Sequence, residues 1–163
     1  MARLVVICGP VGAGKSTYGR RLARETGACL LDSDTLTEPV VRAGMALGEL
    51  DADDRDSPAY REAFRDPVYE CLFQVATENL PHCDVILVGP FTSEIRDPNW
   101  HLHLFARFEV VPEIIYVWAE DEVRHQRIET RGNPRDAAKL ADWKRFLASH
   151  RSECPACPHR FVS

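Results

Sequence analysis

Hydrophobic residues gather in short runs along the chain, and longer polar stretches separate these runs. The runs are rich in Val, Ile and Leu and are too short for helices, which is typical of strands buried in a parallel sheet. They predict strands over residues 3–8, 28–32, 84–88 and 114–118, with a last strand over 159–162.

The polar stretches between the runs have the features of helices. Gly27 ends the first stretch as a C-terminal cap, and the pattern Thr35-x-x-Glu38 is a capping box that opens the second. These stretches predict helices over residues 15–26, 35–48, 58–80, 100–108, 120–130 and 135–150, with a bend at Pro67 and a charged loop over 49–57. Strands that alternate with helices predict an α/β fold, in which helices cover both faces of a parallel sheet. Because the sequence contains no repeat or linker, residues 1–163 are expected to form one domain.

The first strand leads into a glycine-rich turn that carries the pattern G-x-x-x-x-G-K-[ST], the Walker A pattern. Glycines let the backbone point successive N–H groups inward, and the N-terminus of the following helix adds its own free N–H groups, so this turn can hold phosphate. Lys15 can reach the terminal phosphates of a nucleotide, and the Ser16 hydroxyl can bind Mg²⁺. The predicted phosphate-binding loop comprises Gly9, Pro10, Val11, Gly12, Ala13, Gly14, Lys15, Ser16 and Thr17.

Charge and cysteine content bear on the binding partners of the protein and on its location in the cell. The chain has 20 Lys and Arg against 25 Asp and Glu, so it lacks the basic excess typical of proteins that bind nucleic acid. No apolar stretch reaches membrane-spanning length, and Met1 leads directly into a strand rather than a signal peptide. We therefore expect a cytoplasmic protein. Cys8, Cys29, Cys71 and Cys83 sit in or beside apolar segments and are expected to be buried free thiols.

Motifs that other nucleotide-binding classes need do not occur in the sequence. A GTPase needs D-x-x-G and N-K-x-D, and neither is found. A motor ATPase needs an acidic residue at the end of a strand, but the third strand ends "VILVGPF", with Gly89 in that position and Asp84 at the opposite end. A compact phosphotransferase remains.

Two aspartates follow the second strand in the segment "LLDSDTL". In an extended chain Asp32 and Asp34 would point to one face, at the sheet edge where the phosphate-binding loop lies. A carboxylate there can orient an acceptor hydroxyl and accept its proton. The alternative is that Asp34 caps the next helix.

Arginines recur along the predicted helix at 120–130 and just beyond it. The row consists of Arg124, Arg127, Arg131 and Arg135. Their spacing is helical, and guanidinium groups suit the phosphate oxygens of a transferring phosphoryl group. Residues 132–134 break the helix and can act as the hinge of a lid over residues 120–138. The alternative is a solvated helix with ion pairs such as Glu120–Arg124.

From Gly9 through Arg135, the chain resembles the small P-loop kinases, which include chloramphenicol phosphotransferase-like, gluconate- and shikimate-kinase-like, and polynucleotide-kinase-like proteins. This resemblance implies a three-layer P-loop NTPase fold with strand order 2-3-1-4-5, and ATP with Mg²⁺ as the source of the phosphoryl group. The resemblance implies catalytic roles for Lys15, Asp34, Arg127 and Arg131, with Asp34 as general base. It also implies that Arg127 and Arg131 bind the nucleotide, and that Ser16 and Asp32 bind Mg²⁺.

The expected function is therefore the transfer of the γ-phosphate of ATP to a hydroxyl of a small molecule, by a monomer or weak homodimer. One alternative is a kinase for the 5′-hydroxyl of a polynucleotide or nucleoside. Another is an ATP-binding regulatory protein without transfer activity, which would have no need for a base at Asp34.

The acceptor is expected to bind to the segment between the second and third strands, residues 33–80. Candidate side chains in this segment and after the third strand are Arg42, Arg61, Arg65, Tyr69, Thr92 and Ser93. Those on helices could equally form a surface stripe. Polynucleotide 5′-kinases usually have an arginine three residues after the base, where this chain has Thr37, which favours a small-molecule acceptor over nucleic acid.

Four residues near the C-terminus, His150, Cys154, Cys157 and His159, are of types that bind zinc. Zinc sites usually join two separated ligand pairs, whereas these four are crowded together among prolines. A structural zinc site is one interpretation, and a loop of free thiols is the favoured one.

Overall fold

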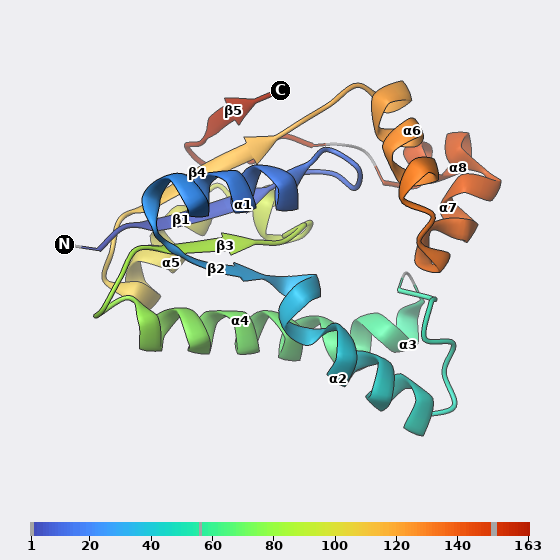
Figure 1. Ribbon diagram of the computed structural model, residues 1–163, viewed down its shortest axis with the longest axis horizontal. Coiled ribbons are helices and arrows are strands. Elements are labelled where there is room, and N and C mark those ends of the chain that lie inside the picture. The colour runs from blue at the N-terminus through green and yellow to red at the C-terminus, as the bar shows by residue number, and fades with distance from the viewer. Residues whose placement is uncertain (1, 56, 151–152) are drawn as a thin grey trace.

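A five-stranded parallel sheet runs through the centre of the protein (Figure 1). The computed structural model describes residues 2–55, 57–150 and 153–163. The strands are β1 (Leu4–Cys8), β2 (Cys29–Asp32), β3 (Val85–Val88), β4 (Pro112–Val117) and β5 (Arg160–Val162). Their order in the sheet is β2-β3-β1-β4-β5, which confirms the predicted order.

Helices cover both faces of this sheet, because successive residues of each buried strand point to opposite sides. On one face, Val5 and Ile7 of β1 pack with Leu22 of helix α1 (Lys15–Thr26). On the other face, Leu4 and Val6 belong to a core that includes residues of α4 (Asp66–Asn79) and α5 (Trp100–Phe108). The three-layer α/β fold is confirmed.

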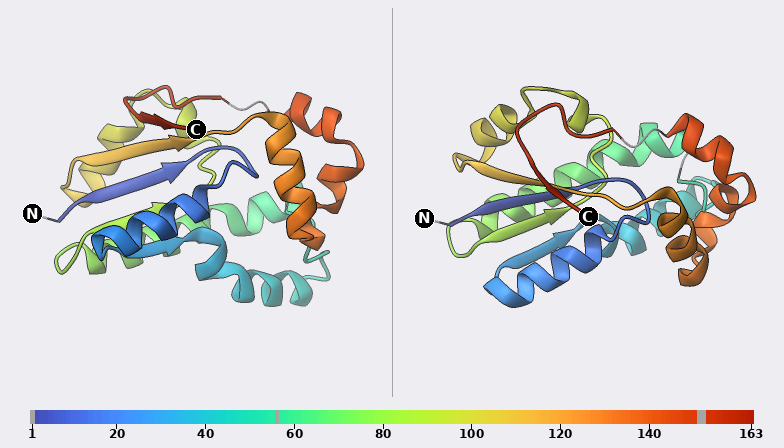
Figure 2. Two further views of the ribbon diagram at one scale, coloured as in Figure 1. Left: turned by 45° about the horizontal axis from the view of Figure 1, so that its top comes forward. Right: turned by 90° about the horizontal axis from the view of Figure 1, so that it is seen from above.

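The remaining helical segments gather near the carboxyl ends of the strands, at the right of Figure 1 and in both views of Figure 2. They are α2 (Ser33–Leu47), α3 (Pro58–Tyr60), η1 (Arg61–Arg65), α6 (Asp121–Arg131), η3 (Pro134–Asp136), α7 (Ala137–Ala141) and α8 (Trp143–Ser149). A short turn, η2 (Glu94–Arg96), follows β3. Binding sites of parallel α/β sheets lie at this edge, so these segments are placed to contribute to one.

The start of α2 differs from the predicted capping box. The helix begins at Ser33, and the carboxylate of Asp32 caps it by accepting hydrogen bonds from the backbone N–H groups of Asp34 and Thr35. Thr35 therefore lies inside the helix. The predicted alternation of Asp32 and Asp34 in an extended chain is wrong as well. Asp32, at the end of the strand, is the N-cap of α2, so the helix begins at the next residue and Asp34 lies inside it.

The predicted helix at 58–80 forms, but its irregular part precedes Pro67. Residues 61–65 make a π-helical turn, and Pro67 lies in the first turn of the α-helix that follows. Because proline lacks an N–H group and crowds the preceding turn, an extra residue ahead of it lets the helix pass without a break.

The predicted helix at 135–150 is divided into three shorter segments. Asp142 adopts a non-helical conformation, with φ of −145° and ψ of 74°, between α7 and α8, and its carboxylate accepts a hydrogen bond from the N–H of Arg145, so it starts a new helix. A helix-capping aspartate inside the expected helix is the physical reason for this difference.

The cysteines are only partly where they were expected. All six are free thiols, and Cys8 is buried. Cys29 and Cys83 are half-buried, while Cys71 is exposed on α4, so the prediction of burial is wrong for Cys71. Within the described ranges, none of the helices combines the length and the apolar character that crossing a membrane requires.

Candidate functional site

The glycine-rich turn joins β1 to α1 in a conformation that requires its glycines. Gly9, Gly12 and Gly14 all have positive φ angles, of 140°, 77° and 102°. A Cβ atom on Gly9 would lie 2.1 Å from the carbonyl oxygen of Val117, and one on Gly12 would lie 2.9 Å from that of Arg124. The loop is thus wedged between the end of β4 and helix α6, with α1 starting at its far end.

Lys15 folds back over this loop. Its Nζ donates a hydrogen bond of 2.8 Å to the carbonyl oxygen of Pro10. Burial lowers the pKa of Lys15 to about 8, while the charges of Asp34 and then Asp32 act in the opposite direction. Arg131 lowers this pKa further, so two acids and one guanidinium lie within electrostatic reach of the ammonium group.

Asp32 ends β2 and is buried, with an exposed fraction of 6%. Its Oδ1 caps α2, but its Oδ2 is also buried and has no hydrogen-bond partner among the described residues. Buried polar atoms in proteins are almost always paired, so an oxygen of this kind fits a bound cation or water. Its place at the carboxyl edge of the sheet fits the Mg²⁺ that accompanies a nucleotide.

Asp34 lies in the first turn of α2, and its side chain is 71% exposed. Because Asp32 caps the helix, the alternative role of Asp34 as the cap is not what the structure shows. Its Oδ1 lies 3.4 Å from Nη2 of Arg135, while Nη1 of the same guanidinium donates a hydrogen bond of 3.0 Å to Oε2 of Glu38. Arg135 thus bridges two carboxylates of α2 from the segment that follows α6.

Glu38 is the centre of a larger ion-pair group. Its Oε1 accepts a hydrogen bond of 3.0 Å from the buried Arg55 and lies 3.7 Å from the guanidinium of Arg42. We call Glu38, Arg42, Arg55 and Arg135 the Glu38 cluster. It connects α2, the loop before α3 and the segment after α6.

The arginines of the predicted row make different contacts. Arg127 donates hydrogen bonds to the carbonyl oxygens of Ala13 and Gly12, at 2.9 and 3.4 Å, so it lies against the phosphate-binding loop. Arg131 pairs with the buried carboxylate of Asp136, at 2.6 Å from Nε to Oδ2. Helix α6 ends at Arg131 and is capped by Gly132, which has a positive φ of 59°, so the predicted break in the helix is confirmed.

Arg124 was part of the predicted row, but no separate task was assigned to it. The structure buries it completely, which excludes the solvated pair with Glu120. Its Nε donates a hydrogen bond of 2.9 Å to the carbonyl oxygen of Val11, and its Nη1 pairs with Asp121 at 2.7 Å. The sequence analysis named Glu120 as a partner of Arg124, whereas the structure pairs Arg124 with Asp121, whose i,i+3 spacing could have indicated this pair.

The acceptor candidates differ in their surroundings. Nη2 of Arg65 donates hydrogen bonds of 2.8 Å to both carboxylate oxygens of Glu94, and Arg42 pairs with Asp53 at 2.8 Å. Tyr69 belongs to the hydrophobic core, where its hydroxyl accepts a hydrogen bond of 3.0 Å from the N–H of Phe91. The other three candidates, Arg61, Thr92 and Ser93, are exposed.

The four residues of the zinc interpretation, which was not the favoured one, do not form a metal-binding group among the described residues. Across residues 2–55, 57–150 and 153–163, no three acidic, histidine or cysteine side chains lie close enough to hold a metal ion. Cys154 is exposed, Cys157 is buried, and a ring nitrogen of His159 lies 2.9 Å from the carbonyl oxygen of Cys157.

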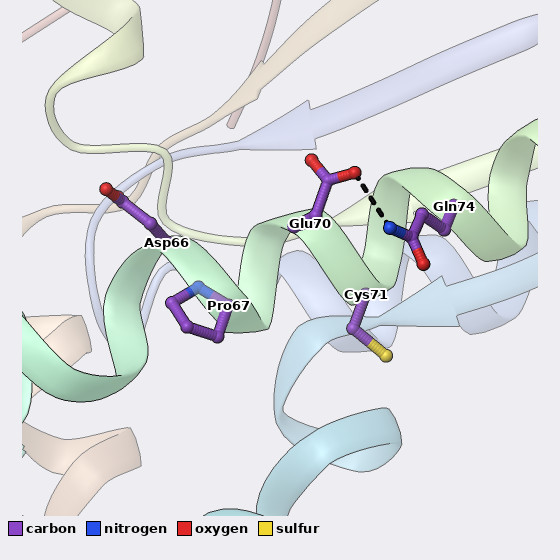
Figure 3. A pocket seen from close by; sticks show the side chains of 5 residues that line it. All are labelled: Asp66, Pro67, Glu70, Cys71 and Gln74. Atoms are coloured by element: carbon purple, nitrogen blue, oxygen red, sulfur yellow. Dashed lines mark hydrogen bonds between the residues drawn. The ribbon is translucent and has the colours of Figure 1, made fainter.

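A separate depression of about 650 Å³ lies on the surface of α4 (Figure 3). It is lined by Asp66, Pro67, Glu70, Cys71 and Gln74. These residues all come from one helix, and none belongs to the phosphate-binding loop or the Glu38 cluster, so the depression is not part of the candidate site.

Comparison with known proteins shows the family of this chain. A family model described as an AAA domain, AAA_33, matches residues 4–152. The chain belongs to this family. Within it, the glycine-rich loop is a nucleotide-binding P-loop.

Relatives of this AAA_33 protein include kinases. A shikimate kinase from Corynebacterium efficiens is 51% identical over 73 residues, which are 44% of this chain and 41% of the relative. The chain thus spans less than half the length of this curated relative. A shikimate kinase from Acinetobacter baumannii, solved in complex with shikimate, has a TM-score of 0.58 at 20% identity and covers 100% of this chain and 84% of that one.

A gluconokinase from Sinorhizobium meliloti has a TM-score of 0.53 at 16% identity, and the match covers 99% of this chain and 83% of that chain. At these identities the structural likeness shows the fold, and the fold alone does not carry an activity. The activity has to be argued from the site.

Proposed function

We propose that this protein is an ATP-dependent kinase that transfers the γ-phosphate to a hydroxyl group of a small molecule. The observation that supports this function best is the setting of Lys15. It combines a P-loop lysine with two carboxylates, Asp34 and Asp32, that lie within electrostatic reach of it. A protein that only binds nucleotide has no need for the second, exposed carboxylate.

In this proposal the P-loop binds the phosphates of ATP through its backbone N–H groups, Lys15 and the N-terminus of α1. Ser16 and Asp32 would hold Mg²⁺, for which Oδ2 of Asp32, buried and without a hydrogen-bond partner among the described residues, is a suitable ligand. When bound, Mg²⁺ neutralises charge on the phosphate oxygens. Thr17 stands exposed in the first turn of α1, within the same loop motif.

Asp34 is proposed as the general base. Its exposed carboxylate can accept a hydrogen bond from an acceptor hydroxyl, orient that oxygen towards the phosphoryl group, and take its proton as the new bond forms. Arg127 and Arg131 would contribute positive charge at the phosphates, where guanidinium groups suit the charge that spreads over the oxygens.

We also propose that residues 120–138 form a lid and residues 33–80 form the acceptor side. The support is the contact of Arg135 with Asp34 and Glu38, which joins the two segments. A lid closed over this edge would keep water from competing with the acceptor. The names of the relatives suggest polyhydroxylated acids as acceptors. Nucleic acid is disfavoured as the acceptor, because Thr37 stands where polynucleotide kinases have an arginine and because the chain has more acidic than basic residues.

The proposal is tested by ATP turnover across a panel of acceptors. The panel contains shikimate, gluconate, simple sugars, nucleosides, hydroxylated antibiotics and an oligonucleotide with a 5′-hydroxyl. ADP production should rise well above the background with one class of small molecule, with the phosphorylated product found by mass spectrometry. A response to the oligonucleotide alone would favour the 5′-kinase alternative, and binding of ATP with no turnover on any acceptor would favour the regulatory one.

A further inference from the structure

Arg124 is a charged side chain in a place where charge is costly. Its side chain is 1% exposed, and burial lowers its pKa while Asp121 acts in the opposite direction. A buried guanidinium is tolerated only where its N–H groups are well paired, and an apolar residue of similar volume is often as good for stability. The question is therefore which contact of Arg124 a methionine or leucine could not replace.

The contact with Val11 is of this kind. Val11 lies in the P-loop, and its carbonyl oxygen accepts a hydrogen bond of 2.9 Å from Nε of Arg124. A trans peptide group is planar, so its C=O and its N–H point in opposite directions. Fixing the carbonyl of Val11 against α6 therefore aims the N–H of Gly12 away from α6, towards the inside of the loop.

Arg127 acts on the next part of the loop in the same sense. It donates to the carbonyl oxygen of Ala13 at 2.9 Å, which directs the N–H of Gly14 away from α6. The N–H of Ala13, between these two, is used inside the loop, because it donates to Pro10 at 3.3 Å. Two arginines of α6 thus hold the carbonyl oxygens of the two peptide groups whose N–H groups belong to Gly12 and Gly14.

Arg124 is itself held from two other elements. Asp121 pairs with it from the first turn of α6, and the ring of Trp143 in α8 lies 5.6 Å from its guanidinium carbon. Gly12 lies close against α6, since a Cβ on Gly12 would approach the backbone carbonyl oxygen of Arg124 to 2.9 Å. Loop, α6 and α8 are therefore packed around one guanidinium group.

We propose that Arg124 is a positioning residue for nucleotide binding: it orients the Val11–Gly12 peptide group so that the N–H of Gly12 faces the phosphates. The inference rests on the proposed function, since it assumes that the P-loop holds a nucleotide. Arg124 touches no substrate in this account and acts through the loop. Helix α8 takes part through Trp143, which covers the guanidinium.

The test compares ADP binding of the unmodified protein with that of Arg124→Met and Arg124→Lys. Arg124→Met keeps the volume but donates no hydrogen bond, and its ADP affinity, measured by calorimetry, should fall roughly 10-fold or more, the usual effect of losing a hydrogen bond from a charged group. Arg124→Lys retains a donor without the fork and should lose less. Arg107→Met is the matched control, since Arg107 also pairs with a carboxylate and stacks on an aromatic ring, but far from the loop.

A second readout separates orientation of the loop from a general loss of stability. In ¹⁵N-labelled protein without nucleotide, the amide signal of Gly12 should move in Arg124→Met, while the signals of Gly27 and Gly48 stay in place. ADP should then shift the Gly12 signal in the unmodified protein much more than in the variant. Arg124→Lys provides the same comparison if Arg124→Met does not fold.

The outcomes are distinct. If the unmodified protein binds ADP and Arg124→Met binds it within twofold, with an unmoved Gly12 signal, the inference about Arg124 is wrong and the kinase proposal stands. If the unmodified protein does not bind ADP at millimolar concentration, the proposed function fails, and this inference fails with it.

Discussion

At the scale of single residues, the ammonium group of Lys15 has a pKa well below that of an ordinary lysine. Burial holds its pKa at about 8, so a measurable fraction is neutral slightly above physiological pH. Phosphate groups placed beside it would stabilise the protonated form and raise the pKa in the complex. Nucleotide binding and protonation of Lys15 are therefore linked.

The first prediction concerns the pH dependence that follows. Below about pH 8 Lys15 is protonated in the free protein, and affinity for ADP should be nearly constant. As the pH rises above 8, binding must take up a proton, so affinity should fall by up to about tenfold per pH unit. Calorimetry at pH 7, 8 and 9, in two buffers of different ionisation enthalpy, would measure both the affinity and the proton uptake. Constant affinity without proton uptake up to pH 9 would contradict the lowered pKa.

The second prediction concerns Asp34. Asp34→Asn keeps the size of the side chain but cannot accept the proton of an acceptor hydroxyl. Nucleotide affinity should change little, while acceptor phosphorylation should fall by roughly a hundredfold or more, the usual contribution of a positioned general base. A smaller loss is expected if Asp34 mainly orients the hydroxyl, since many phosphoryl transfers have loose transition states.

Three results complete this test. Stability should be unaffected, because Asp32 rather than Asp34 caps α2. Asp32→Asn should instead weaken the dependence on Mg²⁺ concentration. Full activity of Asp34→Asn would remove the general base from the proposal and leave Lys15 and the arginines as its only catalytic groups.

At the scale of elements, α2 and the segment after α6, which we propose as part of a lid, meet through the Glu38 cluster. The carboxylate of Glu38 accepts hydrogen bonds from Arg55 on one oxygen and from Arg135 on the other, both at 3.0 Å. Arg55 is 8% exposed, so it depends on this carboxylate as its counter-ion. Glu38 therefore carries more of the contact between the two elements than a surface ion pair would.

The third prediction follows from that position. Glu38→Gln should lower the free energy of unfolding by about 1–3 kcal/mol, because buried donors of Arg55 lose a charged acceptor. It should also raise the KM for the acceptor more than it changes nucleotide affinity, because Arg135 is released from its place beside Asp34. Denaturant unfolding and steady-state kinetics measure the two effects.

A matched control for Glu38→Gln is Glu70→Gln. Glu70 pairs with Arg107 at 2.7 Å on the surface, where ion pairs contribute little. If both variants behave alike, the Glu38 cluster does not connect the proposed lid to α2 in the way described.

The elements also show how much of the site could be predicted from sequence. The apolar runs predicted the strands, and the glycine-rich pattern predicted the loop, since both depend on neighbouring residues. Whether Asp34 lies in a strand or a helix depended on which side chain capped α2, and Asp32 proved to be that residue. The burial of Arg124 depended on Trp143, in a helix that begins only after the break at Asp142. Contacts of that kind leave no periodic signal in a sequence.

At the scale of the whole molecule, nucleotide should stabilise the fold. This is the fourth prediction. A ligand at about a hundred times its dissociation constant adds roughly 2.7 kcal/mol to the free energy of unfolding. For a domain of this size, that corresponds to a rise in Tm of roughly 5–11 °C. Differential scanning fluorimetry with ADP or ATP and Mg²⁺ should show the rise, and Lys15→Ala should lose most of it. A Tm that is indifferent to millimolar nucleotide would contradict nucleotide binding by the loop.

The position of β1 in the sheet has a consequence for the order of events during synthesis. Its residue Leu4 pairs with Val85 of β3 and Pro112 of β4, and Arg124 reaches Val11 across 113 positions of sequence. At a usual pace of about 5–20 residues per second, the loop leaves the ribosome roughly 6–23 s before the helix that orients it. A nascent chain can therefore display the whole glycine-rich motif before the helix that would orient it exists. Tight binding of nucleotide would come late for this protein, after the chain has been made past α6.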